Sequence, residues 1–186
     1  MGYYVLLILQ VPLFPIMLYI CGTPSVGKFR RLPDSCLGYL GVVTLGFAYH
    51  SENNDYKVVR VSCCPWIRPQ IPDGIEVYAL RSDSWRRVGM SLRANLMLYD
   101  NNSRLPIPLV SGALHYNVSD VEGDGECKSE VILSFDVNNE KFRMLGMPDV
   151  SMSIRRSQTC LASIKGKLAF LTFWQSEHHG YHYSMW

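Results

Sequence analysis

Short runs of alternating hydrophobic and polar residues make up most of this chain, and polar or glycine-containing turns separate them. A clear example is Tyr56–Val61, which is rich in β-branched residues and follows the polar stretch Ser51–Asp55. Alternation with a period of two, bounded by turn-forming residues, is typical of β-strands. A helical period is present only weakly, at Ser91–Tyr99. The pattern therefore predicts an all-β protein.

One strand opening occurs three times: an aromatic residue, an arginine, any residue and then an aliphatic residue. The copies are Lys28–Leu32, Ser84–Val88 and Lys141–Leu145, and their aromatic residues are 56 and 57 residues apart. In the second and third copies another aromatic residue, Tyr78 or Phe135, stands seven residues earlier, before a polar turn. We interpret each copy as part of a hairpin of two antiparallel strands.

A second short segment also recurs, which begins with glycine and continues into alternating apolar residues. Its copies are Gly46–Tyr49, Gly112–Tyr116 and Gly166–Phe170. We interpret each glycine as the start of a strand that another backbone approaches closely. Repetition at about 50 residues is typical of stacked modules such as propeller blades, which cannot bury their apolar faces alone. The sequence therefore predicts repeated antiparallel hairpins in an incomplete β-propeller-like, kelch-like arrangement, in preference to chance alternation.

The repeated hairpins also predict roles for individual side chains. Trp85 and Phe142 occupy matching positions and are expected in the core. Asp83 and Asp136 stand beside the hairpin turns. Aspartate in such a place commonly accepts hydrogen bonds from its own backbone, and we expect that of both.

The N-terminal segment is almost wholly apolar from Tyr3 to Ile20, interrupted only by Gln10 and two prolines. Two prolines so close together would break a membrane-spanning helix, and no Lys or Arg precedes Lys28 as in a typical signal peptide. We expect buried or edge strands here, and we rank membrane association second. Residues 1–22 are treated as an atypical apolar segment and residues 23–186 as the domain.

Composition and charge narrow the possible functions. The 186 residues are 48% hydrophobic and 18% charged, and this hydrophobic content is high enough to form a folded core. The net charge of +2 is too small to indicate a nucleic-acid-binding surface. The six cysteines show no disulfide framework, so we expect free thiols and a cytoplasmic or nuclear protein. Two glycosylation patterns, at Asn101 and Asn117, carry little weight because such short patterns arise by chance.

No catalytic motif is present, and we expect no enzyme activity, no metal and no cofactor. The strongest candidate for a metal site is the group His178, His179 and His182. Such histidines could share a metal on a helix, but Gly180 and the neighbouring tyrosines disfavour a helix here. Cys63 and Cys64 are adjacent and lack the spacing of a zinc or redox pair. A propeller-like metal- or sugar-binding domain is the alternative class.

A binding protein would use exposed aromatic residues and arginines on irregular loops. Trp66 and Trp174 could equally fill gaps between blades. The candidate binding residues are Trp66, Arg68, Arg93, Tyr99, Trp174 and Tyr181.

Several short segments follow one another in a distinctive order: Leu45–His50, Asn54–Arg60, Glu76–Tyr78 with Ser82–Arg86, Gly112–His115, and Ile132–Asp136 with Glu140–Phe142. Together they resemble the F-box associated domain of plant F-box proteins, from about Thr23 to the C-terminus. The resemblance implies a substrate-receptor subunit of an SCF-type ubiquitin ligase, in which an N-terminal F-box docks the Skp adaptor and this domain holds the target protein.

The sequence departs from that family at both ends. No F-box precedes Thr23, and the family's Trp-Asn-Pro-Ser appears here as Gly22–Ser25, without the aromatic residue. The chain stops at Trp186, where family members continue into further strands. We expect a partial domain that binds a target, with Skp adaptor and cullin contacts only in a full-length parent. A non-functional gene fragment is the remaining alternative.

Overall fold

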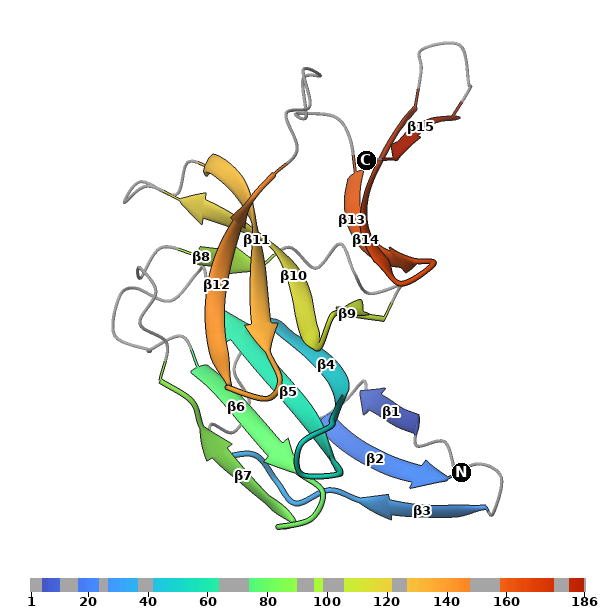
Figure 1. Cartoon of the computed structure of the whole chain (residues 1–186), viewed down its shortest axis with the longest axis vertical. Coiled ribbons are helices and arrows are strands. Elements are labelled where there is room, and N and C mark those ends of the chain that lie inside the picture. The colour runs from blue at the N-terminus through green and yellow to red at the C-terminus, as the bar shows by residue number, and fades with distance from the viewer. Residues whose placement is uncertain are drawn as a thin grey trace.

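The computed structural model of the chain is all-β. It describes residues 5–10, 17–23, 27–36, 42–63, 74–89, 96–98, 106–121, 127–147, 158–175 and 181–185. Within these ranges the chain forms fifteen strands in four antiparallel sheets, here named A to D in chain order (Figure 1). No helix in the described ranges is long and apolar enough to span a membrane.

Each sheet is built from strands that are close together in the sequence. Sheet A contains β1 (Val5–Gln10), β2 (Met17–Thr23) and β3 (Lys28–Arg31), in that order. Sheet B contains β4 (Val42–His50), β5 (Asp55–Cys63), β6 (Gly74–Ala79) and β7 (Ser84–Arg87), also in chain order. Sheet C has the order β12 (Lys141–Gly146), β11 (Cys127–Asp136), β10 (Ala113–Val121) and β8 (Leu96–Leu98), with β9 (Leu109–Val110) also pairing to β10. Sheet D contains β13 (Gln158–Ile164), β14 (Lys167–Gln175) and β15 (Tyr181–Met185).

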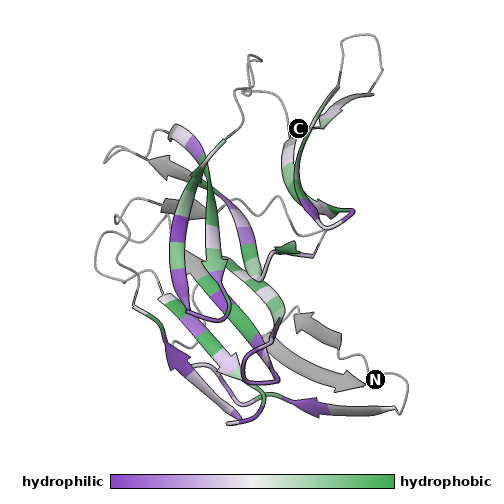
Figure 2. Ribbon diagram, viewed as in Figure 1, coloured by the Kyte–Doolittle hydropathy of each residue, from purple (hydrophilic) through white to green (hydrophobic). Residues whose placement is uncertain are grey.

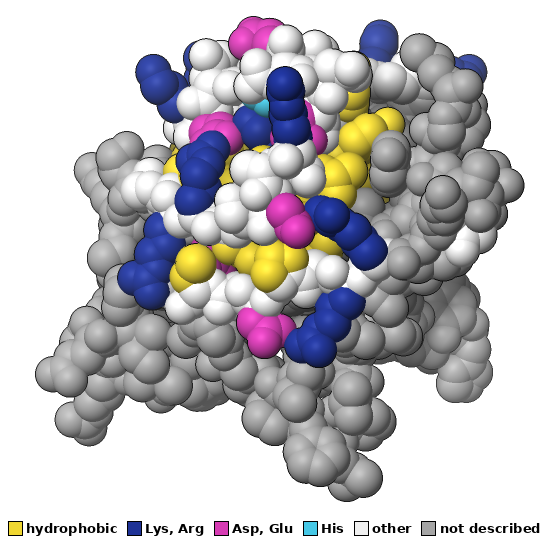
Figure 3. Space-filling model, turned by 90° about the horizontal axis from the view of Figure 1, so that it is seen from below, with side chains coloured by type: hydrophobic (Ala, Val, Ile, Leu, Met, Phe, Trp, Pro, Cys, Tyr) yellow, Lys and Arg dark blue, Asp and Glu magenta, His cyan; other side chains and the backbone are white. Residues whose placement is uncertain are grey.

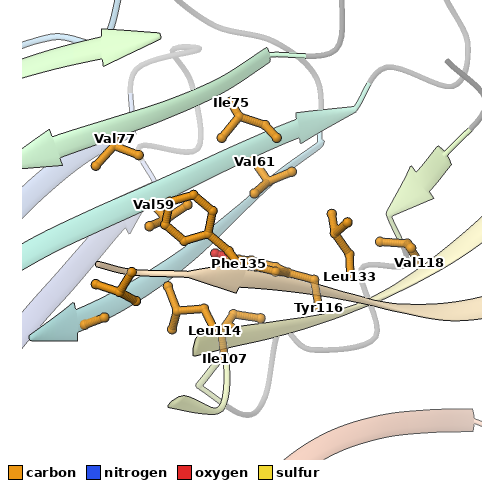
Figure 4. Close-up of a cluster of buried hydrophobic side chains, with 12 residues drawn as sticks. Val59, Val61, Ile75, Val77, Ile107, Leu114, Tyr116, Val118, Leu133 and Phe135 are labelled. Carbon is orange, nitrogen blue, oxygen red and sulfur yellow. The ribbon is translucent and has the colours of Figure 1, made fainter. Parts of the chain in front are cut away.

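The sheets stack because sheet B is apolar on both faces. Val59 and Val77 meet Leu114 and Phe135 of sheet C in the largest buried cluster of described residues (Figure 4). On the opposite face of sheet B, Val58, Tyr78 and Trp85 pack with Leu32, which follows β3 of sheet A. A third cluster, formed by Ile132, Leu161 and Phe170, joins sheets C and D. Neighbouring sheets therefore bury one another's faces, as the repeat predicted.

The three aromatic strand openings occupy equivalent places, which confirms the repeat. Their strands β3, β7 and β12 are each an outermost strand of a sheet. Tyr78 lies directly opposite Trp85, and Phe135 lies opposite Phe142, with ring centroids 5.3 Å and 4.7 Å apart. Trp85 is buried as predicted, whereas Phe142 is half-buried against the core. In the first copy Phe29 faces Gly22 across the strands, so the aromatic pair is absent there.

The hairpin turns share one backbone conformation. Asn54, Asp83 and Glu140 each end a turn with positive φ, at 50°, 52° and 54°. The prediction for Asp136 is confirmed, because its carboxylate accepts hydrogen bonds from the backbone amides of Asn138 and Asn139, which lower its pKa. The prediction for Asp83 is wrong, since its carboxylate accepts bonds from side chains of Tyr78 and Arg30 instead.

The prediction of glycine-led strands is partly wrong. Gly112 and Gly166 precede β10 and β14, but each has positive φ and open space around it, so turn conformation explains them. Gly46 lies inside β4 rather than at its start. A Cβ atom there would lie 2.6 Å from both the Leu114 Cδ1 and the Tyr116 hydroxyl oxygen, so this glycine does permit a close approach, by side chains of sheet C.

Other predictions have structural outcomes as well. The apolar N-terminal segment forms the antiparallel strands β1 and β2, and the weak helical period at Ser91–Tyr99 contains β8 instead. Among the described cysteines, Cys36 and Cys160 are free thiols. Asn117, in one of the glycosylation patterns, is 2% exposed and donates a hydrogen bond to Thr159, so its side chain is inaccessible in the folded chain.

Candidate functional site

Two ion-pair clusters, which we call clamps, join neighbouring sheets at their turns. In the first, Arg30 of β3 contacts the Asp83 carboxylate of sheet B at 2.8 Å and the Tyr78 hydroxyl at 2.5 Å. In the second, Arg86 of β7 forms an ion pair with Glu140 of sheet C. Lys57 of β5 reaches the same carboxylate at 2.7 Å. Each clamp therefore holds a turn of one sheet against the preceding sheet.

The clamps repeat because the sequence repeats. Arg30 and Arg86 each follow the aromatic residue of a strand opening. Asp83 and Glu140 each stand two residues before the next aromatic residue, in the positive-φ position of the turn. The left-handed conformation of these acidic residues thus belongs to a shared geometry that presents a carboxylate to the previous sheet.

The two clamps differ in burial. The side chains of Arg30 and Asp83 are 46% and 56% exposed, whereas those of Lys57 and Glu140 are 6% and 14% exposed. Burial alone would raise the pKa of Glu140, but hydrogen bonds from Lys57 and Arg86 outweigh it and lower that pKa. Burial, followed by the bond to Asp83, raises the pKa of Tyr78 to about 12, so its hydroxyl stays protonated as a donor.

The turns 51–54, 80–83 and 137–140 form one continuous region, which we call the turn-end surface. The amide of Asn138 donates 3.3 Å hydrogen bonds to Ser51 and Glu52, which links the two hairpin turns of sheets B and C. Figure 2 shows hydrophilic residues at this end of the strands. Figure 3, seen from below, shows basic and acidic side chains around a band of hydrophobic ones. Because the clamps fix these turns, the surface is preorganised.

The turn-end surface carries residue types that protein interfaces favour. Tyr49 is 43% exposed, and its ring packs on Tyr56, which in turn stacks on Phe47. Arg81, in the turn 80–83, is exposed and forms no ion pair with another described residue. Exposed tyrosine and arginine on a rigid scaffold are typical of interface hot spots.

The binding residues predicted from sequence lie elsewhere. Trp174 lies in β14 and Tyr181 begins β15, so these two belong to paired strands rather than to an irregular loop. Their contribution to binding stays a prediction. The residues that fall outside the described ranges are Trp66, Arg68, Arg93 and Tyr99.

The histidine cluster is also only partly visible. His182 lies in β15 opposite Trp174, and His178 and His179 fall outside the described ranges. Among the described residues no group of three His, Cys, Asp or Glu side chains could hold a metal.

The turn-end surface was not predicted from the sequence. Binding residues were expected in long irregular loops, whereas Tyr49 lies beside a tight turn and Arg81 lies within one. The available signal was the polar and charged composition of the repeated hairpin turns, which contain the acidic residues Glu52, Asp83 and Glu140 and one arginine, Arg81.

A polar seam lies between sheets C and D. The Asn117 amide donates to the Thr159 hydroxyl at 2.8 Å, and His115 lies 3.4 Å from the Ser134 hydroxyl. His115 is 6% exposed, and its burial lowers its pKa. The imidazole is therefore held neutral inside the stack, where protonation would be costly.

Stacked antiparallel sheets joined by repeated clamps, with interface-type residues on one end, define a propeller-like β domain. Comparison with known families agrees: the model for the F-box associated beta propeller domain matches residues 13–186. The chain belongs to this family. The match begins within the apolar segment of residues 1–22, and the pairing of β2 with β3 joins part of that segment to the residues that follow.

One curated relative is an F-box protein of Arabidopsis thaliana. It is 26% identical over 131 residues, which cover 68% of this chain and 32% of the relative. The chain therefore spans about a third of the length of that relative.

Proposed function

We propose that this chain is a protein-interaction module that binds a target protein, as the substrate-recognition domain of an SCF-type ubiquitin ligase subunit. The observation that carries the proposal is the family match across residues 13–186. The turn-end surface supports it, because rigid exposed tyrosine and arginine side chains suit recognition of another polypeptide. The module itself performs no chemistry in this proposal.

Binding at the turn-end surface needs little reorganisation. The turns are already fixed by two clamps and by the Asn138 contacts, so few backbone torsions have to be ordered when a partner arrives. Preorganisation reduces the entropic cost of association. Tyr49 would supply contact area at low rotamer cost, and Arg81 would supply charge-assisted hydrogen bonds.

The wider assembly belongs to the proposal too. We assign contacts with the Skp adaptor and the cullin to a full-length parent that carries an F-box, and we place the protein in the cytoplasm or nucleus. In that arrangement the domain brings a bound target to the ligase for ubiquitination.

The test is affinity capture from plant extract with this chain and a full-length parent side by side. Proteins captured by both are then purified and titrated against the chain. We expect Tyr49→Ala combined with Arg81→Glu to weaken binding at least about tenfold, while Lys165→Glu, at the exposed turn before β14, leaves it unchanged. Absence of any shared captured protein, or equal binding by the Tyr49/Arg81 variant, would contradict the proposal.

A further inference from the structure

The series of clamps contains a third arginine whose position is equivalent but whose partner is missing from the described chain. Arg143 follows Phe142 in the third strand opening, as Arg30 and Arg86 follow the aromatic residues of the first two. In the first two clamps the arginine reaches the next sheet in the stack. By the same rule Arg143 should reach a carboxylate on the side of sheet D.

The strand register places Arg143 on that side. Arg143 lies directly opposite Ser134, whose hydroxyl lies beside His115. His115 and Asn117 share one face of β10, and Asn117 donates to Thr159 of sheet D. Residues that are directly opposite in adjacent strands point to the same face. Arg143 therefore projects toward the side occupied by sheet D.

No carboxylate of the described residues fills this position. Arg143 and its neighbour Lys141 are exposed and form no ion pair with another described residue. Asp136 is close enough for Arg143 to help lower its pKa, but both of its carboxylate oxygens accept hydrogen bonds from the turn that follows it. The row Lys141, Arg143 and Leu145 thus presents two exposed cations that form no ion pair with a described residue, and an aliphatic side chain that is 39% exposed.

We infer that Arg143 binds an acidic side chain in an extended segment of a protein partner, an inference that rests on the proposed function. Arg143 and Leu145 are two residues apart in a strand, so they match a partner segment with an acidic residue and, two positions later, an apolar or aromatic one. The acidic residues of the two clamps have the same spacing to an aromatic residue. Asp83 stands two positions before Trp85, and Glu140 stands two positions before Phe142. The surplus of positive charge selects an acidic partner over a basic one.

The probe is a labelled synthetic peptide with blocked ends and the sequence of residues 82–85, which contains the acidic-x-aromatic pattern of Asp83 and Trp85 and no basic residue. Fluorescence anisotropy should show that it binds the wild-type chain, and that Arg143→Glu weakens binding about tenfold. Asp83→Asn in the peptide should weaken binding similarly, without a further loss when both changes are combined. The matched control is Lys167→Glu, which makes the same reversal of charge at an exposed residue of sheet D and should bind as wild type. Circular dichroism melts check that the variants fold.

Binding that is equal for wild type and Arg143→Glu, or for the peptides with and without Asp83→Asn, would overturn the inference. Concentration-dependent dimers of the chain that Arg143→Glu abolishes would identify a second copy as the occupant, and would overturn it too. If the chain captures a target that Arg143→Glu captures equally well, this inference fails while the proposed function stands. If neither form captures any shared target, the proposed function fails and this inference fails with it.

Discussion

At the scale of single residues, Gly46 shows how tightly sheets B and C pack. Gly46→Ala would place a methyl group 2.6 Å from Leu114 and from the Tyr116 hydroxyl, which is too close without movement of the core. We expect a loss of about 1–3 kcal/mol in the free energy of unfolding, measured by urea denaturation. Gly146→Ala, where the new methyl group meets open space, should change it by less than about 0.5 kcal/mol. Equal effects at the two glycines would contradict this account.

Glu140 is the residue on which the buried clamp depends. Glu140→Gln removes the charge that Lys57 and Arg86 share and leaves the Lys57 ammonium buried without a carboxylate. We expect a loss of about 3 kcal/mol in the free energy of unfolding. Asp83→Asn, in the exposed clamp, should cost less than about 1 kcal/mol, because solvent screens that pair. Chemical denaturation of both variants at neutral pH makes the comparison.

The same carboxylate predicts a pH dependence. The pKa of Glu140 is lower in the folded chain than its ordinary value of 4.5, so the unfolded chain binds the proton more readily. The stabilisation is therefore complete above about pH 4.5 and is lost as the pH falls through the lower folded pKa. Stability curves of wild type and Glu140→Gln should converge toward acid pH. Parallel curves across that range would show that Glu140 is not the group responsible.

At the scale of elements, the hairpin of β6 and β7 is held by the aromatic pair Tyr78 and Trp85 and by a 2.8 Å hydrogen bond from the Trp85 indole to the Pro33 carbonyl. Trp85→Ala should cost about 3–5 kcal/mol in unfolding free energy. Trp85→Phe keeps a ring but loses the hydrogen bond, so it should cost about 1 kcal/mol beyond the change in packing. Thermal and urea unfolding of both variants measure the difference, and a cost for Trp85→Ala near that of an exposed site would refute the core assignment.

The sequence predicted hairpins well because their decisive contacts are local. The aromatic pairs that define them join residues seven positions apart, and their spacing is visible without any tertiary information. The clamps were not predicted, since Arg30 and Asp83 are 53 residues apart and meet only once two sheets have stacked. Gly46 was misplaced at a strand start for a related reason, because the side chains it accommodates come from another sheet. Of the predicted binding residues, Trp174 and Tyr181 were assigned to a loop, because the histidines and glycine between them show no strand pattern. In the structure both residues belong to the paired strands β14 and β15.

At the scale of the whole molecule, the polar seam between sheets C and D should make the stack sensitive to mild acid. Burial holds the pKa of His115 below its ordinary value of 6.5, so below that pH the unfolded chain takes up a proton that the folded chain resists. Stability should therefore fall as the pH drops below about 6.5 and toward the folded pKa. His115→Gln should flatten this part of the curve in denaturation experiments at several pH values. An unchanged slope in the variant would assign the effect to other groups.

The strained turn residues Asp83 and Glu140 set a limit on how this domain could be engineered. Replacing a non-glycine residue of positive φ by glycine is a common route to a more robust protein, because glycine adopts that backbone without cost. Here the substitution would relax each turn while deleting the acid that anchors it to the sheet before it. A designer who makes these changes for heat resistance would therefore uncouple adjacent blades. The unfavourable backbone torsions of Asp83 and Glu140 are the cost of holding each turn against the sheet before it.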